Sequence, residues 1–256
     1  MRRLAAVLPA VAVALAAAPA LAQVNTEALR ADLETRTRYL AVQATFAGHV
    51  GNSNGVVGSG AAFAGATFGR HLIFLKVQGD YADFSGEVTI AKAFAHARYD
   101  VTILPFLDAE AFVQVEANRF WRLALRQVDG LGARFGLVQR TDVRLFYGTG
   151  WMLDYEKLDG SYVFGGGPAW FAQRWSNYVA ATWKLNDRSR LTETFYIQPR
   201  INGFSDFRLL NDAAFVIDID KRFSVKVDCQ VHHNSTPPSH VVPTDLDTTT
   251  SLVLTL

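Results

Sequence analysis

The sequence has 256 residues, half of them hydrophobic, with 25 Lys and Arg against 24 Asp and Glu. Because both charge signs are interspersed and nearly balanced, the chain lacks the clustered Lys and Arg that a nucleic-acid-binding face needs. The single cysteine, Cys229, cannot form an intramolecular disulfide.

The N-terminus has the pattern of a secretory signal peptide. Met1-Arg2-Arg3 carries positive charge, and an Ala/Val/Leu-rich stretch runs from Leu4 to Leu21. Ala20-Leu21-Ala22 has the small-x-small pattern of a cleavage site, so residues 1–22 are predicted to be removed and Gln23 to begin the mature chain. The alternative, a transmembrane anchor, is disfavoured because prolines interrupt the stretch and no positive flank follows it.

Residues 23–37 are the part of the mature chain without a strand pattern. Leu29 and Leu33, four residues apart among charges, suggest a short periplasmic helix or a loose leader. Residues 38–256 follow without a linker and are long enough for one large all-β domain. We therefore expect a signal peptide, a periplasmic N-terminal leader and a single barrel domain.

Alternation with a period of two dominates residues 38–256. In the clearest case, Phe223 to Asn234, Phe, Val and Cys at odd positions alternate with Ser, Lys, Asp, Gln and His at even positions. Such alternation places apolar side chains on one face of a strand and polar ones on the other. About twelve segments of this kind can be drawn, most near the ~10 residues that a tilted membrane strand needs. Their predicted bounds are Arg38–Val50, Gly55–Thr67, Arg70–Tyr81, Glu87–Tyr99, Leu107–Asn118, Gln127–Val138, Asp142–Tyr155, Trp170–Leu185, Arg188–Pro199, Ser205–Ile219, Arg222–Asn234 and Asp245–Leu256.

The connections between these segments alternate in length. Tight turns are predicted at Gln139–Thr141, Asn186–Asp187 and Asp220–Lys221, and long connections at Asn118–Arg126, Glu156–Ala169 and Ser235–Thr244. Outer-membrane barrels have short periplasmic turns at one rim and longer extracellular loops at the other. This pattern predicts a closed antiparallel transmembrane β-barrel of about twelve strands, with both termini in the periplasm.

A soluble, lipocalin-like barrel is the alternative, with the apolar face inside and the polar face in water. The apolar faces of about twelve strands are too much surface for one soluble barrel to bury, which favours the membrane arrangement. Aromatic residues near the strand ends also suit the level of the lipid headgroups. The aromatics assigned to this membrane interface are Tyr81, Trp121, Trp151, Tyr155, Trp170, Trp175 and Phe207.

Three segments carry a resemblance to a known family. They are Gly48–Ser53 after the first strand, Leu123–Gly136 with its Gly130-Leu131-Gly132 core, and the Ser235-Thr236-Pro237-Pro238 stretch leading to Asp245. In these the chain resembles the YdiY-like, putatively salt-induced outer-membrane proteins, domain of unknown function 481. The resemblance implies an outer-membrane barrel without an assigned activity, with a role in osmotic stress. Its expected partners are outer-membrane lipid and lipopolysaccharide and, in transit, periplasmic chaperones and the barrel-assembly machinery.

The polar strand faces predict what fills the lumen. Charges of both signs fall on them, and inside a closed barrel they must be paired or hydrated. One interpretation is an ion-pair network that fills a narrow barrel, and the other is a small polar channel with little selectivity. The predicted lumen residues are Glu110, Glu116, Arg134, Arg144, Asp154, Lys184, Arg208, Asp212, Asp218, Lys226 and Asp228.

No catalytic, metal-binding or cofactor-binding set emerges from the sequence. A lipid-modifying enzyme would need a histidine and a serine on one face, but Ser224 lies on the face opposite His233, and Ser251 is expected to face the lumen. His232 and His233 are adjacent, so they point to opposite faces and cannot readily chelate one ion. The glycine clusters lack the strand-turn-helix setting of a phosphate cradle, so no nucleotide is expected.

Overall fold

The structure is a computed structural model that describes Glu27, Arg30, Leu33 and residues 37–49, 55–84, 86–119, 121–160 and 168–256. The predicted signal peptide lies outside the described residues. No helix within the described part of the chain is long and apolar enough to cross a membrane.

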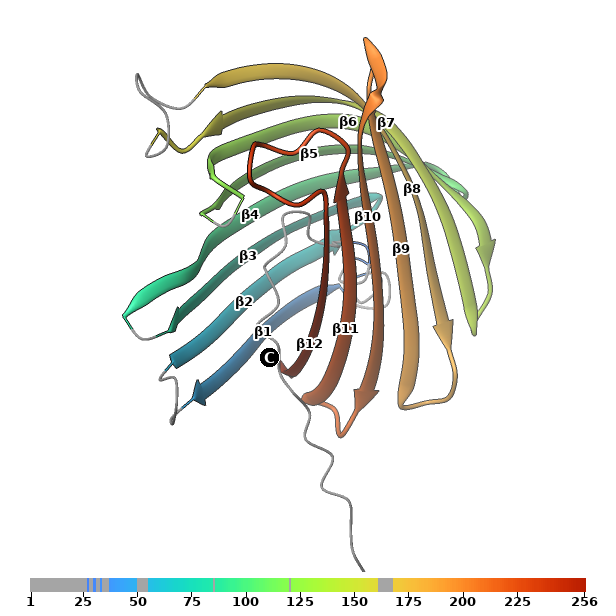
Figure 1. The fold of residues 1–256 in the computed structure, drawn as a ribbon. Coiled ribbons are helices and arrows are strands. Elements are labelled where there is room, and N and C mark those ends of the chain that lie inside the picture. The colour runs from blue at the N-terminus through green and yellow to red at the C-terminus, as the bar shows by residue number, and fades with distance from the viewer. Residues whose placement is uncertain are drawn as a thin grey trace, which may run out of the picture.

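The described residues form twelve strands that close into one antiparallel barrel (Figure 1). The predicted fold class and strand number are therefore confirmed. The strands are β1 (Arg38–His49), β2 (Gly55–Phe68), β3 (His71–Phe84), β4 (Glu87–Leu104), β5 (Leu107–Asn118), β6 (Leu123–Gln139), β7 (Val143–Leu158), β8 (Ala169–Lys184), β9 (Ser189–Arg200), β10 (Gly203–Asp218), β11 (Phe223–Asn234) and β12 (Thr244–Thr255).

Each strand pairs with the next one in the sequence, and β1 closes the ring against β12. This seam pairs Ala41 with Thr255 and continues to Ala44 opposite Leu252. Other pairs are far longer: β2 and β3 stay in register from Gly55 opposite Phe84 to Phe68 opposite His71. The ring is therefore closed, but at the seam it is closed over only these four residue pairs, far fewer than between any other two neighbours.

Side chains alternate across the barrel wall as the period of two predicts. In β11, Val227 is 44% exposed on the outside and its neighbour Asp228 is 6% exposed on the inside. In β5, Val113 and Val115 face outward, and Gln114 between them is buried. The apolar face is therefore outside and the polar face inside, the arrangement of membrane barrels and the reverse of a lipocalin-like barrel.

One rim, called here the short-turn end, carries the turns after β2, β4, β6, β8 and β10 and also the C-terminus. The three predicted tight turns are confirmed there. In the turn between β10 and β11, the Asp220 carboxylate accepts hydrogen bonds from the backbone N–H groups of Arg222 and Phe223, at 2.7 and 2.8 Å. These two bonds hold the pKa of Asp220 below its ordinary value, so the charged form is the one that shapes the turn.

The opposite rim, called here the loop end, differs from the prediction. Strand β6 begins at Leu123 instead of Gln127, so the connection from β5 shrinks to residues 119–122. The connection between β9 and β10 is also tight, at residues 201–202, whereas those from β7 to β8 and from β11 to β12 are long. Strand pairing continues past the apolar band because backbone groups gain hydrogen bonds there whatever their side chains. Periodicity alone therefore underestimates strand length.

Candidate functional site in the barrel lumen

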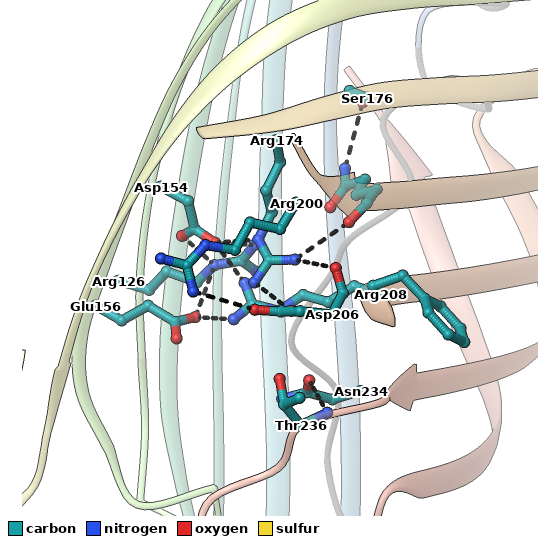
Figure 2. A network of polar contacts seen from close by, with 12 residues as sticks. Arg126, Asp154, Glu156, Arg174, Ser176, Arg200, Asp206, Arg208, Asn234 and Thr236 are labelled. Carbon is teal, nitrogen blue, oxygen red and sulfur yellow. Dashed lines mark hydrogen bonds and ion pairs between the residues drawn. The ribbon is translucent and has the colours of Figure 1, made fainter. Parts of the chain in front are cut away.

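Asp154 on β7 lies at the centre of a buried cluster of charges (Figure 2). Its Oδ1 atom accepts a hydrogen bond from Arg126 Nε at 2.9 Å. Its Oδ2 atom accepts from Arg174 Nε at 3.0 Å and from Arg208 Nη1 at 2.6 Å. Asp154 is 1% exposed, so three guanidinium groups replace the water that would otherwise hydrate this carboxylate.

Strand register brings these side chains together. Arg126 on β6 pairs with Glu156, and Arg174 on β8 pairs with Met152, so each lies two residues from Asp154 on a neighbouring strand. Such diagonal neighbours on one face of a sheet are within reach of long side chains. Arg208 reaches Asp154 from β10, two strands beyond β8.

Three further carboxylates balance the cluster. Glu156 forms ion pairs with Arg208 and, at 3.3 Å, with Arg126. Asp206 pairs with Arg174 at 2.9 Å, and Glu116 lies 3.8 Å from Arg126. Arg200 lies 3.7 Å from Asp206, so the cluster holds four arginines and four carboxylates. We expect it to fill space and resist hydration without a strong preference for either sign of ion.

A second layer of contacts crosses the lumen. Arg98 on β4 lies 3.6 Å from Glu110 on β5, and the Tyr178 hydroxyl on β8 donates to Glu110 Oε1 at 2.6 Å. Tyr196 on β9, whose ring lies 5.1 Å from that of Tyr178, lines the same small cavity as Arg98. Strands β4 and β9 are separated by four strands in the ring, so these side chains approach each other from opposite walls.

The three described residues of the N-terminal segment lie inside the barrel. Glu27 forms ion pairs with Arg98 and Arg134, and Arg30 pairs with Asp100 at 2.6 Å. Leu33, 1% exposed, packs with Tyr39, Phe63, Leu72 and Phe74. The prediction of a wholly periplasmic leader over residues 23–37 is therefore wrong for these residues. Glu27, Arg30 and Leu33 are spaced by three residues, so they lie on one face of a helix. Each contacts residues of complementary chemistry on the barrel wall.

At the loop end, Trp121 reaches across the opening. It lies in the connection between β5 and β6, and its indole N–H donates to Asp245 Oδ2 on β12 at 2.9 Å. Its ring lies 5.8 Å from that of His232 on β11. The assignment of Trp121 to the membrane interface is wrong, because the chain turns inward where alternation no longer determines which way a side chain points.

Ten of the eleven predicted lumen residues lie on inward positions of the strands. Glu110, Glu116, Arg134, Asp154, Arg208, Asp212 and Asp228 are buried, whereas Arg144, Asp218 and Lys226 are partly exposed toward the short-turn end. Lys226 pairs with Asp228 at 2.5 Å, and Arg190 pairs with Asp218 at 3.4 Å. Lys184 is the exception: it is 47% exposed at the end of β8, where it pairs with Asp187 of the following turn.

Five of the seven predicted interface aromatics lie on outward positions: Tyr81, Trp151, Tyr155, Trp175 and Phe207. Trp151 and Trp175 are opposite each other on β7 and β8, and each indole N–H donates to a neighbouring polar side chain. Besides Trp121, Trp170 departs from the prediction, because it pairs with the inward-facing Glu156 and so takes the lumen side of β8.

Several lumen residues were missed from the sequence. His96, Arg98 and Asp100 alternate with Ala95, Ala97 and Tyr99 along β4, a signal of the same kind as the one used elsewhere. Arg174 on β8 alternates with outward-facing aromatics in the same way. Arg126 could not be found by this means, because it was assigned to a loop.

Among the described residues, His233 contacts neither of the two serines considered as its catalytic partners. The Ser251 hydroxyl is buried in the lumen beside Gln43, whereas His233 contacts Thr244 and stacks on Phe207. Ser224 donates to Asp218 on the inward face. Within the part of the chain that the structure describes, no group of three His, Cys, Asp or Glu residues could hold a metal ion.

The closed ring of twelve strands, with apolar residues outside and a charged interior, defines an outer-membrane-type β-barrel. A family model matches residues 42–256, and the chain belongs to that family, a protein family of unknown function designated DUF481. This confirms the resemblance to domain of unknown function 481, and the likeness to YdiY-like, salt-induced proteins stays a prediction. No curated protein matches the chain in sequence.

Solved structures with a similar fold are also outer-membrane barrels. The NanC porin superposes with a TM-score of 0.51 at 9% identity, covering 84% of this chain and 98% of the porin. The translocator domain of the autotransporter NalP from Neisseria meningitidis gives a TM-score of 0.51 at 13% identity, covering 90% and 92% of the two chains. At such low identity these similarities establish the fold alone.

Proposed function

We propose that this protein is a non-enzymatic outer-membrane barrel whose lumen is closed by its own side chains and that it serves the envelope structurally. The signal-peptide pattern supports export, and the family resemblance supports a role during osmotic stress. The short-turn end then faces the periplasm, the outer face contacts lipid and lipopolysaccharide, and periplasmic chaperones and the assembly machinery deliver the chain.

The observation that carries this proposal is the set of contacts between opposite walls. Tyr178 joins β8 to Glu110 on β5, and Trp121 joins the connection after β5 to β12. Glu27 and Arg30 lie inside the barrel, where they form ion pairs with residues of β4, β5 and β6. Each of these contacts involves a group that is buried or largely so. A hydrated pore would leave such charges exposed to water, where ion pairs contribute little and need not be retained.

A narrow channel is the second candidate, favoured by one observation. A cavity of about 490 Å³ reaches into the barrel from the short-turn end. If the N-terminal segment left the lumen, that cavity would extend past Glu27 and Arg30 toward the middle of the barrel. The two candidates therefore differ in whether this segment stays in place.

Planar-bilayer recording separates them. The wild-type protein should give no resolved single-channel steps, whereas Arg30→Ala, which removes the ion pairs to Asp100 and Asp108, should give brief openings. Arg140→Ala, in the exposed turn between β6 and β7, is the matched control and should stay silent. Steady wild-type conductance would instead establish the channel.

A further inference from the structure

The cavity at the short-turn end lies between two walls of the barrel. Strands β1, β2 and β3 form one side, and β9 to β12 with the turns after β8 and β10 form the other. Its volume of about 490 Å³ is within the range of small-molecule sites, roughly 300–1,000 Å³. The lining includes apolar groups, among them Phe63 and Val216, and hydroxyl and amide groups, among them Gln43 and Thr192.

Lys76 on β3 points into this cavity. It occupies an inward position between Phe74, which is buried, and Gln78, which is partly buried, and it lies opposite Phe63 of β2. Among the residues that the structure describes, no acceptor lies within hydrogen-bonding or ion-pairing distance of its ammonium group. A partly buried ammonium without a protein partner is costly unless water or a ligand anion solvates it.

The carboxylates nearest Lys76 already have other partners. Asp228 pairs with Lys226 at 2.5 Å, and Asp80 pairs with Lys92 at 3.1 Å. Asp212 accepts a hydrogen bond from the Gln230 amide. Lys76 is therefore the cation of this wall that remains available to a molecule in the cavity.

The lining of the cavity as a whole carries more basic than acidic residues. Its lining contains five basic residues, Lys76, Arg188, Arg190, Lys221 and Lys226, against three acidic ones, Asp187, Asp218 and Asp220. Arg190 pairs with Asp218, and Asp220 is engaged by the backbone of its own turn. The unbalanced charges are thus basic and lie both at the rim and inside, which favours entry of an anion.

We propose that this cavity binds a small organic anion, a carboxylate or phosphate on a body of about monosaccharide size, and that the Lys76 ammonium is its charged anchor. The anionic group would accept a hydrogen bond from Lys76 Nζ. The hydroxyl groups of the ligand would contact Gln43 and Thr192, and its apolar face would lie toward Phe63 and Val216. A barrel closed at mid-height would hold such a solute on the short-turn side without passing it.

Calorimetric titration of the folded, detergent-solubilised full-length protein tests this inference. Glucuronate and glucose 6-phosphate are the probes, because they carry a carboxylate and a phosphate on the same sugar body, and glucose is the uncharged comparison. At least one anion should bind, with glucose at least tenfold weaker. The stronger anion identifies the preferred group. Lys76→Met should weaken anion binding about tenfold to a hundredfold, the range of a lost charge-assisted hydrogen bond.

Two further variants keep the test decisive. Lys76→Arg retains the charge and should retain binding to within a few-fold. Lys157 is an exposed lysine of β7 outside the cavity, so the control variant Lys157→Gln should bind like the wild type. Unchanged heat-modifiable gel mobility shows that each variant is folded. Absence of binding by both anions, or equal binding by Lys76→Met, would overturn the site. Neither result bears on whether the wild-type barrel conducts, so the closed-lumen proposal is judged separately.

Discussion

Replacing Asp154 by Asn tests how the lumen is held together. The change keeps the shape of the side chain but removes the charge that Arg126, Arg174 and Arg208 share. Removing one partner from a buried ion pair costs about 3–5 kcal/mol, because the remaining charges have no water to replace it. Glu156 still contacts Arg126 and Arg208, and Asp206 still contacts Arg174, so we expect a loss near the lower end of that range.

Urea unfolding of the barrel in phospholipid vesicles, followed by tryptophan fluorescence, measures this loss. Asp187→Asn is the matched control, since it makes the same chemical change in an exposed ion pair with Lys184 and should leave the midpoint unchanged. A loss below about 1 kcal/mol for Asp154→Asn would mean that the cluster is hydrated like a surface pair. The reasoning that makes it a plug would then be refuted.

Three other predictions concern the wall, the N-terminal segment and the loop end. Arg in place of Val227, on the outer face, should cost ~2–4 kcal/mol or block assembly, whereas Arg in place of the inward Gln230 should be tolerated better; vesicle-folding yields in the reverse order would contradict the assigned polarity. Leu33→Ala should lower the free energy of unfolding by about 2–5 kcal/mol because this side chain is buried among aromatic rings, and an unchanged urea midpoint would show that the segment does not occupy the lumen. Trp121→Phe removes the hydrogen bond to Asp245 and should cost about 1 kcal/mol, with faster proteolysis of the loop end as a second readout; identical proteolysis rates would argue against closure there.

Periodicity was sufficient to predict the wall of the barrel. Along β11, the side chains from Phe223 to Val231 alternate so regularly that their two faces can be assigned before any neighbour is known. The same reasoning located Asp154 and Arg208 in the lumen, because the parity of a residue within a strand determines the face on which it lies. Strand number follows from this local rule, whereas the polar interior also needed the argument that about twelve apolar faces are too much surface for one soluble barrel to bury.

The contacts between opposite walls depended on the tertiary structure. Tryptophan is a residue type typical of membrane interfaces, yet Trp121 lies outside the regular strands. No periodicity there specifies which way its side chain points. Glu27 and Arg30 look like any solvated charges in the sequence, and only the positions of Arg98 and Asp100 on the wall make them buried partners. Lys184 has the correct parity but lies at the rim, where a turn carboxylate is nearer than the lumen. Parity gives the face of a strand, whereas height along the barrel and the shape of its cross-section decide which side chains meet inside it.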